Sequence, residues 1–97
     1  MPEVVPPVLF THLFPVRKLY MKYVIVEKSC LELPIIFPDV IEHGMFQNVI
    51  SAGFCKIGIG NNRLTVSCWG KSSSLGVKSR AGDSQILEKE INRDFYD

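Results

Sequence analysis

The stretch that decides the fold is FCKIGIGNNRLTVSCW, residues 54–69, in which two alternating runs flank an Asn-Asn pair. Asparagine tolerates the positive φ angles of a type I′ turn, so Asn61-Asn62 is predicted to be a two-residue hairpin loop. Side chains alternate along a strand, so a slip of one residue would exchange the two faces. The predicted register makes one face apolar by pairing Cys55 with Cys68, Ile57 with Val66, and Ile59 with Leu64.

The other face of this hairpin carries Phe54 opposite Trp69, with Lys56 beside them. Aromatic side chains flanked by cations can anchor a protein interface, where Trp and Phe often supply much of the binding energy. They can also stack on the bases of a single-stranded nucleic acid. A third interpretation is that another part of the chain covers this face.

Before this hairpin, the sequence predicts a second one. Residues 22–27 are β-branched and aromatic, Lys28-Ser29 forms a turn, and residues 31–37 return as a strand. Pro34 lacks an amide hydrogen, which places this strand at a sheet edge or marks a bulge. Residues 39–47 are predicted to form a short helix that begins near Asp39 and turns three side chains inward: Val40, Ile41 and Phe46.

Residues 83–95 are predicted to form the longest helix. Leu87, Ile91 and Phe95 share one stripe with Ile86 beside them. Three residues are candidate caps of this helix: Ser79, Asp83 and Ser84. The expected fold is therefore α+β: a four-stranded antiparallel sheet of two hairpins, a short middle helix, and a C-terminal helix packed on one face.

The length of 97 residues suffices for one domain. We interpret residues 21–97 as a single α+β domain and residues 1–20 as an N-terminal extension, either translated from an upstream start or used as a docking arm. A domain of this size is close to the lower limit for one core, so a homodimer that buries further surface would be a natural remedy. Residues 1–20 lack the basic start and unbroken apolar run of a secretory signal. No stretch has the length of a membrane span, so no membrane partner is expected.

The net charge is +1, but the acidic and basic residues are unevenly distributed along the chain. No acidic residue falls between His43 and Gly82, and this interval holds five basic residues: Lys56, Arg63, Lys71, Lys78 and Arg80. This segregation predicts a locally positive surface. The overall charge is too small for a protein that coats duplex nucleic acid.

The loop GKSSSLGVKSR, residues 70–80, combines hydroxyls, glycines and cations ahead of a helix. Exposed amides and the positive end of a helix bind anions. The predicted anion-binding residues are Ser72, Ser73, Ser74, Gly76 and Ser79. A Walker A loop is rejected, because Thr65 stands where its first glycine belongs. The alternative is a solvated connection without a ligand.

Catalytic and metal motifs are missing from the sequence. Cys30, Cys55 and Cys68 form no Cys-x-x-Cys pair, and Cys55 and Cys68 are interpreted as small buried side chains in a reduced compartment. His43 has no predicted acid-base partner. The sequence therefore predicts no enzyme, no cofactor and no metal site.

Four segments resemble small accessory proteins encoded by bacteriophages and prophages: MKYVIVE at 21–27, PIIFP at 34–38, VISAGF at 49–54 and VSCWGKSSSLG at 66–76. The resemblance implies a single-domain protein in the bacterial cytoplasm that starts at Met21 and binds a host protein or signalling molecule. Our leading prediction is a non-enzymatic module that presents six residues to an acidic protein partner: Phe54, Lys56, Trp69, Lys71, Lys78 and Arg80. The alternative is a binder of nucleotide or single-stranded nucleic acid.

Overall fold

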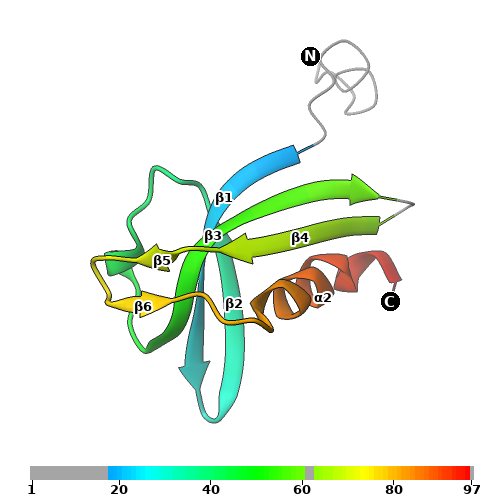
Figure 1. The fold of residues 1–97 in the computed structure, drawn as a ribbon. Coiled ribbons are helices and arrows are strands. Elements are labelled where there is room, and N and C mark those ends of the chain that lie inside the picture. The colour runs from blue at the N-terminus through cyan, green and yellow to red at the C-terminus, as the bar shows by residue number, and fades with distance from the viewer. Residues whose placement is uncertain (1–17, 61–62, 97) are drawn as a thin grey trace, which may run out of the picture.

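The computed structural model describes residues 18–60 and 63–96 (Figure 1). Its main element is an antiparallel sheet with the strand order β2-β1-β3-β4. The strands are β1 (Lys18–Lys28), β2 (Leu31–Phe37), β3 (Val49–Gly60) and β4 (Arg63–Trp69). The other elements are a 3₁₀ turn η1 (His43–Met45), a two-stranded ribbon of β5 (Lys71–Ser72) and β6 (Val77–Lys78), and helix α2 (Asp83–Tyr96). The predicted α+β class with a four-stranded antiparallel sheet is confirmed.

The register predicted for the β3–β4 hairpin is confirmed throughout its length. Phe54 pairs with Trp69, Ile57 with Val66, and Ile59 with Leu64. The predicted Asn61-Asn62 turn lies outside the described residues. The alternation of side chains was enough to fix this register, because only one register makes a whole face apolar.

The β1–β2 hairpin agrees with the prediction except at its ends. Its turn is Ser29-Cys30, where both residues have positive φ (53° and 66°), one position later than predicted. Pro34 lies in edge strand β2, as predicted from its missing amide hydrogen. Strand β1 begins at Lys18, so three residues that we assigned to the N-terminal extension pair with β3. The rest of that extension, residues 1–17, lies outside the described part of the chain.

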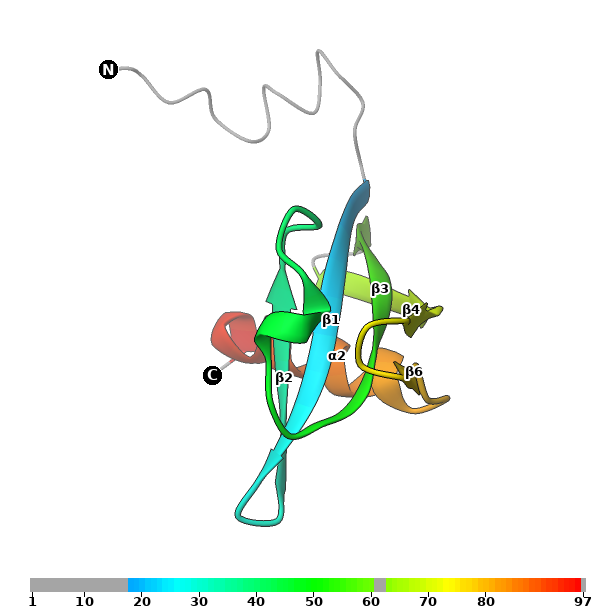
Figure 2. The ribbon, with the colours of Figure 1, turned by 90° about the vertical axis from the view of Figure 1, so that its left-hand side faces the viewer.

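The two faces of the sheet are covered by different elements. Helix α2 lies on one face, and η1 and the β5–β6 ribbon lie on the other (Figure 2). The face beneath α2 holds one core cluster: Tyr23, Ile25, Cys55, Val66 and Leu87. The opposite face holds a second cluster of Val24, Phe37 and Ala52. The predicted packing of the C-terminal helix on the apolar face is confirmed, although the side chain of Phe95 lies outside the described part.

The predicted middle helix is reduced to a single short 3₁₀ turn. Residues 39–47 form turns and the single 3₁₀ turn η1, which follows Glu42 and not Asp39. Val40 is 82% exposed and Ile41 is also exposed, whereas Phe46 packs inward on Phe37 with ring centroids 4.7 Å apart. Tertiary contacts override the weak helical pattern here, because hydrogen bonds to neighbouring segments set the path of this segment.

The outer edge of β4 is closed by side chains of α2. Three helix residues accept hydrogen bonds from alternate strand amides: Ser84 from Cys68 (2.9 Å), Glu88 from Val66 (3.1 Å) and Asn92 from Leu64 (2.9 Å). Four helical residues rise about 6.0 Å and two strand residues about 6.7 Å, so the two repeats match over this length. These amides are therefore not free to pair with another strand.

Candidate functional site

An aromatic patch lies on the sheet face opposite α2. We define it as Tyr20, Phe54 and Trp69. The indole of Trp69 contacts Phe54 at a centroid distance of 6.4 Å and Tyr20 at 6.3 Å, the latter edge-to-face. Tyr20 is 60% exposed and Trp69 is 44% exposed. The ring of Trp69 thus points away from the helix, as the strand alternation predicts.

Phe54 supports this patch from beneath. Its ring is partly buried and contacts the ring of His43 edge-to-face at 5.7 Å. His43 is itself buried and donates a hydrogen bond from Nε2 to the carbonyl of Gly53 (2.8 Å). Gly70 has a φ of +86°, and a Cβ at this position would lie 2.9 Å from Cδ2 of Phe54. Glycine at position 70 therefore lets the Phe54 ring lie against the backbone next to Trp69.

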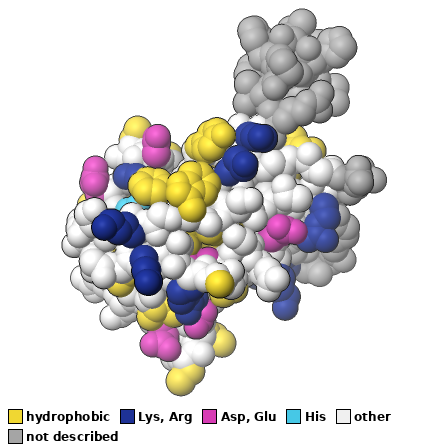
Figure 3. All heavy atoms as spheres, in the orientation of Figure 1, with side chains coloured by type: hydrophobic (Ala, Val, Ile, Leu, Met, Phe, Trp, Pro, Cys, Tyr) yellow, Lys and Arg dark blue, Asp and Glu magenta, His cyan; other side chains and the backbone are white. Residues whose placement is uncertain are grey.

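Basic side chains border the aromatic patch. Lys56 is the direct cross-strand neighbour of Tyr20, and therefore lies on the same face as Trp69. Lys22 also belongs to this face but donates a hydrogen bond to the carbonyl of Ile41 (3.0 Å). In Figure 3, hydrophobic side chains gather over β1 and β3, with basic side chains on either side of them.

Tyr20 was missed by the sequence analysis, which began the first strand two residues after it. The signal was present, since Leu19, Met21 and Tyr23 continue the apolar alternation of β1 backwards. This pattern places Tyr20 on the opposite face, beside Phe54 and Trp69.

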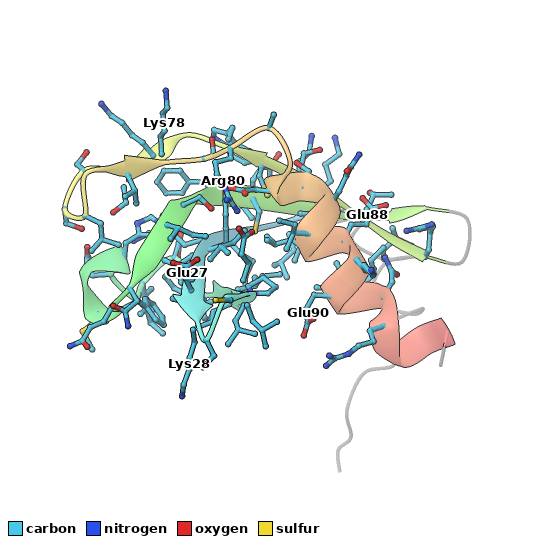
Figure 4. All side chains as sticks on the ribbon, turned by 90° about the horizontal axis from the view of Figure 1, so that it is seen from below. Glu27, Lys28, Lys78, Arg80, Glu88 and Glu90 are labelled. Atoms are coloured by element: carbon cyan, nitrogen blue, oxygen red, sulfur yellow. The ribbon has the colours of Figure 1, made fainter. Side chains whose placement is uncertain are left out.

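Arg80 has a different position from the other predicted partner-binding residues. Its guanidinium bonds Glu32 in β2 (2.9 Å) and Asp83 at the start of α2 (3.1 Å). Figure 4 shows Arg80 pointing inward, whereas Lys78 points away from the body of the protein. Arg80 is thus committed to joining α2 to the sheet, and a partner would have to compete with two carboxylates for it.

Asp83 anchors the N-terminus of α2 in a buried polar network. Its side chain is fully buried and accepts hydrogen bonds from the Tyr23 hydroxyl (2.5 Å) and the Arg80 amide (2.9 Å). Burial tends to raise the pKa of Asp83, but these hydrogen bonds outweigh it and hold the pKa below its usual value. Burial and the neighbouring carboxylate raise the pKa of Tyr23. At neutral pH the pair is a carboxylate and a protonated phenol, which suits a structural role.

The serines predicted to bind an anion divide into two groups. The Oγ of buried Ser72 accepts a hydrogen bond from the Leu75 amide (3.2 Å) and bonds the Oγ of Ser74 (3.3 Å). The amides of Gly76 and Ser79 donate to the carbonyls of Ser72 and Gly70, respectively. These groups stabilise the loop itself. The side chain of Ser73 is exposed and has no such bond within the described part of the chain.

The cations of this loop form a pair. Lys71 and Lys78 are direct cross-strand neighbours in the β5–β6 ribbon, and both are exposed. Beside them lies a pocket of about 620 Å³ that Ser73, Gly76 and Val77 also line. The structure thus separates the predicted surface into the aromatic patch, this lysine pair, and the ion-paired Arg80.

The three cysteines of the described residues are free thiols. Cys55 and Cys68 are cross-strand neighbours with free thiols, and Cys30 is an exposed thiol in the β1–β2 turn. Burial raises the pKa of Cys55 to about 12 and also raises that of Cys68. Within residues 18–60 and 63–96, no three His, Cys, Asp or Glu side chains lie together as metal ligands would.

Comparison of the chain with protein-family models, with curated proteins and with solved structures finds no match. Among the described residues, no helix combines the length and apolar character needed to span a membrane. Function must therefore be inferred from the geometry of the site.

Proposed function

We propose that this protein is a binding module that engages an acidic protein partner through the aromatic patch and Lys56. The observation that carries the proposal is the exposure of Tyr20 and Trp69, which pack on each other on the face opposite α2. Aromatic rings held by packing lose little conformational entropy on binding, and Trp and Tyr are enriched among residues that dominate interface energy. The resemblance to phage and prophage accessory proteins adds the expectation of a host protein as partner.

The charges around the patch favour an acidic partner. No side-chain partner holds Lys56 within the described residues, and the segment from residue 43 to residue 82 contains no Asp or Glu. A basic border steers an acidic surface toward the patch and suppresses binding of basic ones. The long alkyl chain of Lys56 can pack along the rings while its ammonium group stays in water.

A second candidate is single-stranded nucleic acid, which also binds aromatic rings flanked by lysines. Phe54 and Tyr20 both contact Trp69, so part of its surface is already in use and less of it is free to stack on a base. This arrangement favours a protein surface that packs around the edges of the patch.

Site-specific photocrosslinking tests the proposal. A photoreactive amino acid replaces Ser67, which is exposed on the patch side of β4 as the cross-strand neighbour of Lys56, and in a second protein it replaces Gln85, which is exposed on α2. In extract of the source organism, the Ser67 position is expected to crosslink one defined acidic protein that the Gln85 position does not. Equal labelling from both positions would contradict the proposal.

Binding to the identified partner is then measured with Tyr20→Ala/Trp69→Ala. We expect a loss of at least about 2 kcal/mol, since truncation of interface aromatics commonly costs that much. Leu31→Ala is the matched control, because Leu31 is 61% exposed but lies near the turn between β1 and β2. If both proteins bind like the wild type, the patch is not the interface.

Nucleic acid is tested on the same purified protein. Absorbance from co-purified nucleotide, or a gel shift of short oligonucleotides that Tyr20→Ala/Trp69→Ala abolishes, would support the second candidate instead. Sedimentation tests whether the partner is a second copy of the chain: the wild type would then be a dimer, and the double variant a monomer. A truncated protein for this measurement must keep Lys18, because β1 begins there.

A further inference from the structure

The β5–β6 ribbon places two positive charges against each other. Lys71 and Lys78 pair directly, so their Cβ atoms are about 5 Å apart, and like charges at such positions are destabilising. Neither lysine forms an ion pair within the described residues. The basic residues Arg63 and Arg80 on neighbouring segments behave differently, since each bonds a carboxylate.

The backbone of this ribbon is held independently of the two lysines. Its turn is closed by the bond from the Gly76 amide to the Ser72 carbonyl (2.9 Å), and its base by the bond from the Ser79 amide to the Gly70 carbonyl (2.9 Å). Val77 packs into the core cluster on the face opposite α2. The lysine pair thus sits on a rigid support and adds repulsion without contributing to the hydrogen bonds that hold it.

The pocket next to the lysines is a hollow open to solvent and large enough to receive a small molecule. Its volume of about 620 Å³ lies within the usual range of ligand pockets. Ile50 and Val77 also line it, with Val77 packed against the core, and the exposed hydroxyl of Ser73 adds a donor beside the two lysines. Arg80 also lines the pocket, but its charge is balanced by Glu32 and Asp83. The unbalanced charge of the pocket therefore comes from the two lysines.

We infer that this pocket binds a phosphate monoester whose phosphate lies between Lys71 and Lys78 and whose apolar or ring-bearing part lies in the pocket beside them. A phosphate monoester carries nearly two negative charges at neutral pH, which matches the two ammonium groups. A nucleoside monophosphate has the required combination of charge and ring. The inference is independent of the proposed protein-binding function, because it rests on the ribbon and not on the aromatic patch.

The test is a titration of the isotopically labelled full-length protein with adenosine 5′-monophosphate, followed by NMR of the backbone amides. We expect saturable shifts of amides in residues 71–78 at submillimolar to millimolar ligand. Adenosine and inorganic phosphate serve as separate probes: the inference expects phosphate alone to bind more weakly and at the same amides, and adenosine alone not to bind there. Absence of shifts at these amides, or equal binding of adenosine, would overturn it.

Charge-neutral variants show whether the lysines hold the phosphate. Lys71→Gln/Lys78→Gln is expected to weaken adenosine monophosphate binding by at least about tenfold, since hydrogen bonds to charged groups are the stronger ones. Lys28→Gln/Lys89→Gln removes two exposed lysines elsewhere and should bind like the wild type. If both variants weaken binding equally, the effect is one of net charge and the site is wrong.

Thermal unfolding of the same variants separates loss of the site from loss of the fold. Without ligand, Lys71→Gln/Lys78→Gln should unfold at the same or a slightly higher temperature than the wild type, because it removes a repulsion. With ligand, only the wild type and the Lys28→Gln/Lys89→Gln control should be stabilised. A variant that retained full ligand stabilisation without both lysines would overturn the assignment.

Discussion

The two faces of the sheet are formed by the same strands, but they differ in the elements that cover them and in how many side chains stay exposed. Beneath α2, Tyr23, Ile25 and Leu87 are fully buried, and the polar Asp83 is fully partnered. On the other face, η1 and the β5–β6 ribbon cover only part of the strands, and Tyr20 and Trp69 stay exposed. The comparison shows that the face beneath α2 holds the larger buried cluster, whereas the opposite face combines a small buried cluster with exposed rings and closely spaced lysines.

The largest expected effect is a difference in the free energy of unfolding between substitutions on the two faces of the sheet. Leu87→Ala should lower the free energy of unfolding by roughly 3 kcal/mol, because it empties a fully buried site. Trp69→Ala, on the other face, should cost less, about 1–2 kcal/mol, since Trp69 is only partly buried against Phe54 and Tyr20. Chemical denaturation measures both. Equal losses would show that Trp69 belongs to the core and would remove the distinction.

A smaller effect is expected where the aromatic patch meets the backbone. Gly70→Ala should destabilise the fold by about 1–2 kcal/mol, because a side chain is strained at positive φ and would clash with Phe54. It should also change the near-ultraviolet circular dichroism of Trp69. Gly82→Ala is the matched control, since its φ is not positive and a methyl group added there would meet no described atom within 4 Å. If both variants lost the same stability and gave the same circular dichroism, Gly70 would not be needed to accommodate the Phe54 ring.

An effect of about 1 kcal/mol is expected at the edge of β4. Asn92→Ala removes the acceptor for the Leu64 amide and the donor to the Leu64 carbonyl (2.8 Å). Denaturation measures the loss, and hydrogen exchange should show faster exchange of the Leu64 amide. Lys89→Ala, on an exposed part of the same helix, is the control. Unchanged exchange in Asn92→Ala would mean that the helix side chain does not protect this edge.

The most gradual effect is that of pH on the helix-covered face. The pKa of Asp83 is lower in the folded protein than its usual value, so the ionised carboxylate stabilises the folded state above the unfolded pKa of about 4. This contribution is lost as pH falls through the folded pKa. Glu32, whose pKa is lowered by its hydrogen bond to Arg80, acts in the same direction. Asp83→Asn should show a shallower loss of stability below about pH 4; an unchanged slope would contradict this role.

The features that the sequence predicted correctly are those that depend on local patterns, such as the alternation of apolar and polar side chains along a strand. The β3–β4 register followed from one face being apolar, and the edge position of β2 followed from Pro34. The prediction failed where contacts between residues far apart in the sequence determine the structure. Arg80 lies 48 positions from Glu32, so nothing in the loop revealed that this cation was already paired. The segment around Val40 has a helical pattern, but its path is set by contacts with β1 and β3.

The sequence indicated where some residues of the candidate site lie, but not the contacts that they make. Phe54, Lys56 and Trp69 lie together because they share one face of a hairpin whose register was known. The serines predicted to bind an anion could not be sorted from sequence, since only the folded ribbon shows that Ser72 is used internally while Ser73 is exposed. The pairing of Lys71 with Lys78 likewise required the short strands that a serine-rich loop does not suggest.

The three hydrogen bonds from α2 to the edge of β4 have a consequence for misassembly. A second molecule can extend the sheet at this border only after the helix has detached, because the amides that would template it are occupied. The rate of ordered aggregation through β4 should therefore track the local opening of one helix and not global unfolding. We therefore expect one element, α2, to determine whether fibres can form at this border.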